Sequence, residues 1–244
     1  MARTNAGTAL TASHARLQRA LSARILAQLL RLWPAVDTRR PETFDLFQRM
    51  AALLVLDGHR SSAGLAAAYY AGFRMAEGLG GDVRTPLAPQ PPEDRVEGLL
   101  RGSAVVGILR ARSAGMSASV ERNQGWVQLA GAATSLVRDG GRATTLLAVA
   151  NDREVRGYQR VASGNPCAFC AMLASRGPVY SDVFEVHDHC GCVGEPVYAG
   201  SRMPASSERY RSLWDETTAG LSGHDAFLAF RHAIDSPASE AVAA

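Results

Sequence analysis

The sequence predicts a mainly α-helical protein: a helical N-terminal region followed by a small α+β C-terminal domain organised by a zinc-like cluster of cysteine and histidine residues. Three observations support this fold class. Apolar residues recur at helical spacing over the first two thirds of the chain. Aromatic residues, which favour sheets, make up only 7% of the 244 residues. All four cysteines lie between positions 167 and 192.

The first helix is expected to begin at a cap formed by Thr11 or Ser13 and to end near Trp33, because Pro34 follows. Four aliphatic residues spaced four apart predict its inward face, namely Leu17, Leu21, Ile25 and Leu29.

A second helix is expected to open at Glu42 and to be interrupted at Gly58, with a further helical stripe reaching Gly80. The predicted inward residues of this region are Phe44, Phe47, Met50, Leu54, Leu65, Tyr69 and Phe73. The segment from Gly80 to Pro92 contains two adjacent glycines and four prolines. These residues disfavour both helix interiors and strand ladders, so this segment is the predicted linker.

Beyond the linker the sequence predicts a helix over 93–113, with Val96, Leu99, Leu100 and Val106 as its apolar face. Another is expected over 117–138, ended by Gly140 and Gly141, before a short helix from Thr144. Residues 155–161 read as a strand, and helical patterning returns from Ser206 until a frayed tail at Ser236. The predicted division is a helical region at 1–80, a central helical region at 93–152, an α+β domain at 153–205, and a helical segment with the tail at 206–244.

The charge pattern excludes several function classes. All 26 basic residues are arginine, so lysine-dependent chemistry such as Schiff-base formation or P-loop phosphate binding is excluded. A formal net charge of +3 does not indicate a dedicated nucleic-acid binder. No stretch is apolar over the ~18 residues needed to span a bilayer, so we expect no membrane partner and synthesis in a cytoplasm.

The four cysteines and two histidines form two half-sites. Cys167 and Cys170 make a Cys-x2-Cys pair, and after a gap His187 precedes Cys190 by three residues, with Cys192 two residues further on. Zinc favours four such ligands in a tetrahedron, and paired half-sites of this kind are typical of structural zinc modules. The favoured ligands are Cys167, Cys170, His187 and Cys190, with Cys192 as the rival fourth ligand.

Other interpretations of the cluster stand beside this one. Asp188 and His189 are candidates to orient a ligand by hydrogen bonding. Four reduced cysteines can also be small core residues, and a disulfide across the half-sites is a further alternative. A thioredoxin-type redox pair is disfavoured, because no βαβ pattern surrounds it.

The sequence indicates no catalysis. A hydrolytic zinc needs an open position and a general base, and Glu185 and Glu195 are candidates only by proximity, without an HExxH motif. Arg153, Arg156 and Arg160 can contact phosphate, but such a run is more often a solvated strand face. The histidines outside the cluster, His14, His59, His224 and His232, are scattered and predict no function.

The segment GNPCAFCAMLASRGPVY, followed by HDHCGC and EPVY, resembles the C-terminal half of Mu-type (MuF-like) minor head proteins of tailed bacteriophages, in the branch found in phages of actinobacteria. Cys167 and Cys170 match the first pair of the family pattern, His187 its histidine, and Cys190 and Cys192 its second pair. The stretch LAAAYYAGFRMAE also resembles that branch, so the resemblance covers most of the chain.

The resemblance implies a head morphogenesis protein: a minor capsid component in the head interior, associated with the portal and contacting major capsid protein. Packaged DNA is then a nonspecific partner, and self-association is compatible with the wide helical stripes. Two rival functions are a zinc-dependent enzyme, either a nuclease or a transferase, and a DNA-binding module packaged in the virion.

Overall fold

Long helices make up most of the protein, as expected. The structure is a computed structural model that describes residues 4–40, 42–81, 83–162, 164–180, 183–187 and 189–236. Its elements in chain order are α1 (Asn5–Leu32), the short 3-10 helix η1 (Trp33–Ala35), α2 (Glu42–Ala76), α3 (Glu93–Ser113), α4 (Ala118–Asn151), β1 (Val155–Val161), α5 (Ala168–Ser175), β2 (Val193–Tyr198), α6 (Ala205–Thr217) and α7 (Gly223–Asp235).

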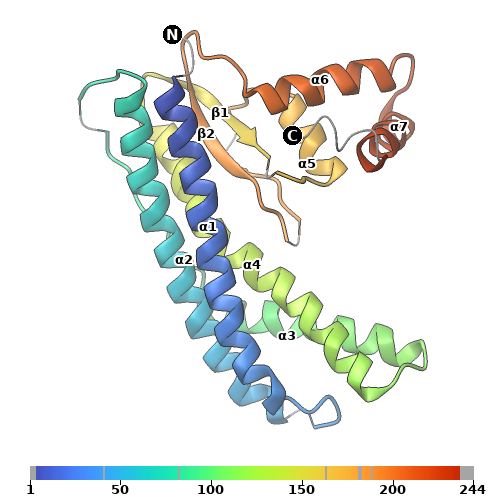
Figure 1. Cartoon of the computed structure of the whole chain (residues 1–244). Coiled ribbons are helices and arrows are strands. Elements are labelled where there is room, and N and C mark those ends of the chain that lie inside the picture. The colour runs from blue at the N-terminus through green and yellow to red at the C-terminus, as the bar shows by residue number, and fades with distance from the viewer. Residues whose placement is uncertain are drawn as a thin grey trace.

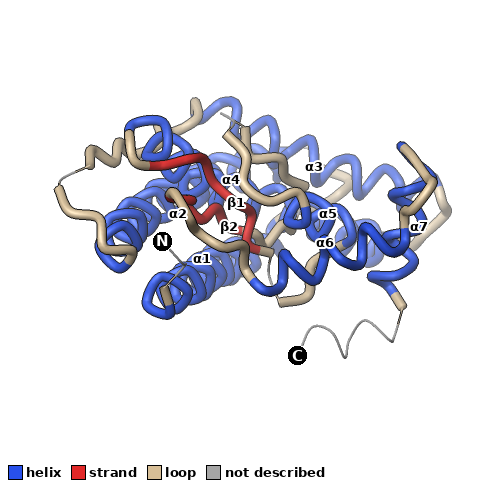
Figure 2. Tube along the Cα trace, turned by 90° about the horizontal axis from the view of Figure 1, so that it is seen from above, coloured by secondary structure: helices blue, strands red, loops and turns tan. Residues whose placement is uncertain are grey.

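The elements form two parts. Helices α1 and α2 run side by side. Helices α3 and α4 form an arm that projects from this pair, and α4 continues from the arm toward the end of the pair where the strands lie (Figure 1). We call α1–α4 the helical body. At that end, β1 and β2 lie beside the body, and α5, α6 and α7 gather on one side of the strands, as the view from above shows (Figure 2). We call β1, β2 and α5–α7 the C-terminal lobe.

Three clusters of buried side chains hold these parts together. One fills the helical body, with Leu29, Val55, Leu100 and Leu129 among its members. The second joins body and lobe, because it contains Tyr70 and Phe73 of α2, Val149 of α4, and Cys170, Cys190 and Cys192 of the lobe. The third lies inside the lobe around Phe230. The cysteines therefore belong to the core that connects the two parts.

The predicted strand at 155–161 is confirmed as β1. It pairs antiparallel with β2, so that Val161 lies opposite Val193 and Gln159 opposite Glu195. Residues 183–187, between α5 and β2, form neither helix nor strand. Helix α5 was not expected at all.

Helix α1 begins earlier than the sequence suggested. Its cap is Thr4, whose hydroxyl accepts a hydrogen bond from Gly7 N at 2.9 Å and donates to Glu77 Oε1 at 2.8 Å. The expected cap Thr11 is instead a buried residue inside the helix, 2.8 Å from the Tyr69 hydroxyl. The side chain of Glu77, which directly follows α2, thus fixes the start of α1.

The expected interruptions at glycine were wrong. Helix α2 continues through Gly58, and α4 continues through Gly140 and Gly141 and includes the segment expected as a separate helix. A Cβ atom at Gly140 would lie 2.1 Å from the carbonyl oxygen of His59, and one at Gly58 would lie 2.9 Å from Val137. These glycines allow α2 and α4 to approach closely, which offsets their low helix propensity.

Four residues expected to face inward are exposed: Leu17, Met50, Leu99 and Val106. The buried face of α1 differs from the predicted one. It includes the polar residues His14, Gln18 and Ser22, which the spacing of the aliphatic residues placed on the solvent side. These residues contact α2 and α4: His14 stacks on Tyr69, Gln18 bonds to Ser62, and Ser22 accepts a hydrogen bond from Arg138. No helix among the described residues is long and apolar enough to cross a membrane. The expected tail begins at Ser236, and residues 237–244 lie outside the described residues.

Candidate metal centre

The first half-site is built by the start of α5. Cys167 is the N-cap of this helix, and its sulfur accepts a hydrogen bond from Cys170 N at 3.5 Å. The cap therefore places the two thiols one helical turn apart, and the helix N-terminus favours negative charge on them. Cys167 is exposed whereas Cys170 is buried, so the half-site runs from the surface into the core.

The second half-site is a tight turn between α5 and β2. Cys190 N donates to the carbonyl oxygen of His187 at 3.1 Å. His189 inside the turn has a φ of 63°, in the left-handed region. This conformation folds the chain back so that His187 and Cys190 meet the first half-site. His189 itself is exposed, and Asp188 lies outside the described residues.

The structure brings all five predicted ligand residues together. His187 Nε2 lies 3.1 Å from Cys167 Sγ and 3.2 Å from Cys170 Sγ, and Cys170 Sγ lies 3.6 Å from Cys190 Sγ. The ligand atoms form two groups within 4.8 Å, Cys167–Cys170–His187 and Cys170–Cys190–Cys192. Cys170 belongs to both groups and is the link between the half-sites.

These separations suit a metal site. Zinc–sulfur bonds near 2.3 Å and zinc–nitrogen bonds near 2.0 Å imply ligand-to-ligand separations of about 3.5–3.8 Å in a tetrahedron. The Cys170–Cys190 separation of 3.6 Å lies in this range, and the histidine contacts are a few tenths of an ångström shorter. All four cysteines are free thiols, so the alternative of a disulfide across the half-sites is not what the structure shows.

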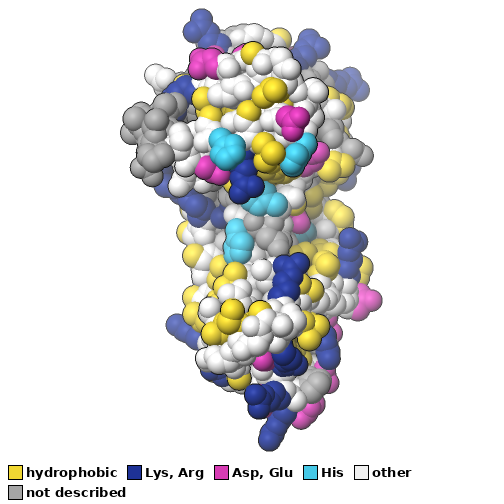
Figure 3. Space-filling view, turned by 90° about the vertical axis from the view of Figure 1, so that its right-hand side faces the viewer, with side chains coloured by type: hydrophobic (Ala, Val, Ile, Leu, Met, Phe, Trp, Pro, Cys, Tyr) yellow, Lys and Arg dark blue, Asp and Glu magenta, His cyan; other side chains and the backbone are white. Residues whose placement is uncertain are grey.

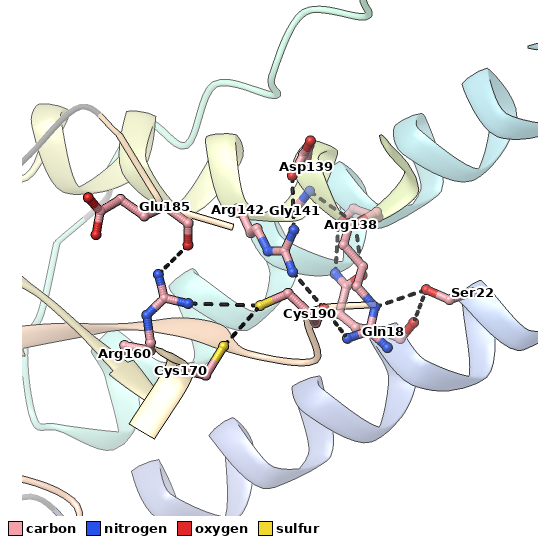
Figure 4. A network of polar contacts seen from close by, with 11 residues as sticks. Gln18, Ser22, Arg138, Asp139, Gly141, Arg142, Arg160, Cys170, Glu185 and Cys190 are labelled. Atoms are coloured by element: carbon pink, nitrogen blue, oxygen red, sulfur yellow. Dashed lines mark hydrogen bonds and ion pairs between the residues drawn. The ribbon is translucent and has the colours of Figure 1, made fainter. Parts of the chain in front are cut away.

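Three buried arginines surround Cys190 (Figure 4). Arg138 and Arg142, one turn apart on α4, donate to its carbonyl oxygen at 3.0 Å and 2.8 Å. Arg160 on β1 lies 3.9 Å from its sulfur and stacks over the ring of Phe184, with its guanidinium carbon 4.1 Å from the ring centre. Positive charge from both parts of the molecule therefore converges on one cysteine.

This environment favours a thiolate. Hydrogen bonds from the thiols of Cys170 and Cys192 hold the pKa of Cys190 well below its ordinary value, and the charge of Arg142 acts in the same direction. The pKa of Cys170 is raised, and the largest cause is its hydrogen bond with Cys190. A thiolate is the form of cysteine that binds metal, so the cluster holds negative charge where a cation is needed.

The two candidate general bases, Glu185 and Glu195, are not among the potential metal ligands that the described residues offer. Glu195 is fully buried, and its two carboxylate oxygens accept hydrogen bonds from Thr11 and from Gln159. Glu185 is exposed, and its carbonyl oxygen accepts from Arg160. Neither carboxylate belongs to a group of potential metal ligands among the described residues.

Sequence reasoning missed the three arginines. All three arginines of the run at 153–160 were expected on a solvated strand face. This holds for Arg156, whereas Arg153 is exposed in the turn before β1, and Arg160 is only 6% exposed. Arg138 and Arg142 were not singled out. The available signal was their spacing of four residues among glycine and alanine, which puts two cations on the crowded, buried side of one helix.

Comparisons with known proteins give one result. No curated protein and no solved structure matches this chain. A family model described as VG15 protein matches residues 5–217, which span the helical body, both half-sites and α6. That match does not single out Mu-type head morphogenesis proteins within phage proteins. The chain belongs to the VG15 protein family, a phage protein family.

Proposed function

We propose that this chain is a minor capsid protein of the phage head, associated with the portal, whose C-terminal lobe is organised by one structural zinc ion. The zinc ligands are Cys167, Cys170, His187 and Cys190. The observation that carries the metal assignment is the position of Cys170, whose sulfur lies 3.2 Å from His187 Nε2 and 3.6 Å from Cys190 Sγ. Membership of a phage protein family and the resemblance to minor head proteins support the place in the particle.

A structural role suits the position of the site. The lobe contains one two-stranded sheet and three short helices among its described residues, and a core of this size stabilises a fold only weakly. A metal held by α5 and by the turn before β2 would link two segments of the lobe that are separate in the sequence. Through Cys190 the same site is bonded to Arg138 and Arg142 of α4. Zinc binding therefore also stabilises the contact between lobe and helical body.

Hydrolytic chemistry is less well supported. Four protein ligands leave no open position on a tetrahedral zinc, and catalytic sites keep one. The carboxylate of Glu195 is engaged by Thr11 and Gln159 rather than turned toward solvent. Chelator-sensitive cleavage of DNA by the purified chain, lost in a Glu185→Ala variant with normal zinc content, would instead favour the enzyme.

Metal analysis tests the zinc assignment. We expect about one zinc per chain in protein purified without added metal. His187→Gln is expected to lose the metal, and His189→Gln, which changes an exposed histidine of the same turn, is the matched control and is expected to keep it. Zinc absent from the unmodified chain, or equal zinc content in the two variants, contradicts the assignment.

Fractionation of phage particles tests the location. The protein is expected in purified heads together with portal and major capsid proteins, and it is expected to resist added protease until the heads are opened. A chain found only in the free-protein fraction of the lysate, with intact heads lacking it, contradicts a capsid role. Gel-shift assays over a range of salt then show whether packaged DNA is a further partner, because nonspecific binding falls steeply with salt.

A further inference from the structure

A small pocket lies behind the metal centre, between the helical body and the C-terminal lobe. It is lined by His14 and Gln18 of α1, by Arg138, Arg142 and Thr145 of α4, and by Cys192 to Gly194 at the start of β2. The pocket has room for about one water molecule or one single-atom ion. In a side view, arginine and histidine side chains gather near the middle of the molecule (Figure 3).

The pocket carries excess positive charge. Arg138 and Arg142 are 8% and 5% exposed, so both cations are shielded from water. Arg142 pairs with Asp139 at 2.9 Å. Among the described residues Arg138 pairs with no carboxylate: it donates to the Ser22 hydroxyl and to the Cys190 carbonyl oxygen. The negative charge of Cys190 is shared among three buried arginines, and Asp139 pairs with only one of them. Positive charge is therefore left over beside the pocket, and a buried excess of charge calls for an anion.

The other charged groups nearby are already engaged. Arg160 lies against the sulfur of Cys190, the thiol whose pKa is lowered by its neighbours. Glu195, next to the pocket-lining Gly194, directs its carboxylate oxygens to Thr11 and Gln159. Burial lowers the pKa of Arg138, and the charge of Arg142 lowers it further, in keeping with two cations held close together.

Two buried nitrogen atoms around the pocket also lack a hydrogen-bond partner. They are Nε of Arg142 and Nδ1 of His14. Buried polar atoms without a partner are rare in native proteins, and each calls for a ligand, an ion or a water. Nε of Arg142 is a donor, and Nδ1 of His14 is one in the tautomer that carries the proton there. Two residues that line the same pocket, one from α1 and one from α4, therefore each have a vacant hydrogen-bonding position.

We propose that this pocket binds one monovalent halide ion, chloride in the cell, held by Arg138, Arg142 and His14. The small volume admits a single-atom anion and excludes phosphate, sulfate and carboxylates. The anion neutralises the charge left by Arg138 and accepts the free N–H groups, so it stabilises the contact of α1 with α4 beside the C-terminal lobe.

Salt substitution on the full chain tests the proposal. Unfolding is measured in sodium chloride, sodium bromide and sodium gluconate at equal ionic strength, since gluconate is too large for the pocket. Above the dissociation constant, each tenfold rise in chloride or bromide is expected to raise the ratio of folded to unfolded protein about tenfold. Crystals grown in bromide are expected to show an anomalous peak between Arg138, Arg142 and His14. Equal stability in all three salts, or a pocket without that peak, overturns the proposal.

A pair of histidine variants separates the site from general salt effects. His14→Phe keeps a ring to stack on Tyr69 but removes the donor, and it is expected to lose the halide response. His59→Phe is the matched control, because His59 is equally buried with an unpartnered Nδ1 but lies outside the pocket. An equal halide response in the two variants overturns the proposal. Zinc is measured in every sample, so a normal zinc content without a halide response rejects the halide site alone.

Discussion

Cys170 and Cys190 meet with their sulfur atoms 3.6 Å apart, although 20 positions separate them in the chain. Each belongs to a different half-site, and each is buried. Between them the chain leaves α5 and returns through the turn at His189 to enter β2. This contact closes the C-terminal lobe on itself, and the arginines bound to Cys190 connect it to α4.

The fourth ligand can be identified by exchanging one cysteine at a time. In the proposed site Cys190→Ser removes a zinc ligand. Loss of a residue that only hydrogen-bonds to a ligand lowers metal affinity by up to about 100-fold, so Cys190→Ser is expected to lower zinc affinity by more than that. Cys192→Ser is the matched control, because this equally buried cysteine lies two residues away. It is expected to retain about one zinc per chain. The reverse result, measured by metal competition, would make Cys192 the fourth ligand.

Arg160 is expected to retain the metal without binding it. Arg160→Gln removes a charge that lies 3.9 Å from Cys190 Sγ, so the thiolate is less well stabilised. Zinc transfer to a chelator is expected to be favoured by about 10- to 100-fold. Arg156→Gln, four residues earlier on the same strand but exposed, is expected to leave zinc transfer unchanged. An equal effect of the two substitutions would mean that only the overall charge matters.

The sequence predicted the cluster of cysteines and histidine better than its surroundings. Cys-x2-Cys and the histidine three residues before Cys190 are local patterns, and their convergence follows from chemistry that needs only a few residues. The burial of Arg138, Arg142 and Arg160 depends on how α4 and β1 pack against the turn at Cys190. Such packing joins residues about 50 positions apart, and no local pattern encodes it.

The helix boundaries show the same distinction. The bounds of helix 93–113 were predicted correctly, because the prolines before it and its acidic first turn mark its start. Of its expected apolar face, only Val96 and Leu100 are buried. Gly58 and Gly140 were misread as helix ends, because in isolation a glycine weakens a helix. Their role appears only when α2 and α4 are side by side, where the missing side chains let two backbones touch.

Alanine substitution tests this interpretation of the glycines. Gly140→Ala would place a Cβ atom 2.1 Å from the carbonyl oxygen of His59, so one helix must shift. We expect a loss of about 2 kcal/mol in the free energy of unfolding. Gly64→Ala is the control, since nothing lies within 4 Å of its added Cβ on the exposed face of α2. It is expected to gain up to about 1 kcal/mol from better helix propensity. Denaturant unfolding of both variants measures the difference.

The buried imidazole of His14 predicts how stability depends on pH. Burial lowers the pKa of His14 from 6.5 to about 4 in the folded protein. Because the unfolded chain takes up a proton at the higher pKa, the neutral folded state loses stability as pH falls from 6.5 toward 4 and loses no more below that. A shift of this size corresponds to about 3 kcal/mol. Comparing wild type with His14→Phe at each pH in sodium gluconate cancels the effect of zinc loss, which acid also causes, and keeps halide away from the imidazole. The stability difference between the two proteins is expected to move by that amount in favour of the variant, and a difference that stays constant with pH would mean that His14 is charged in the folded protein.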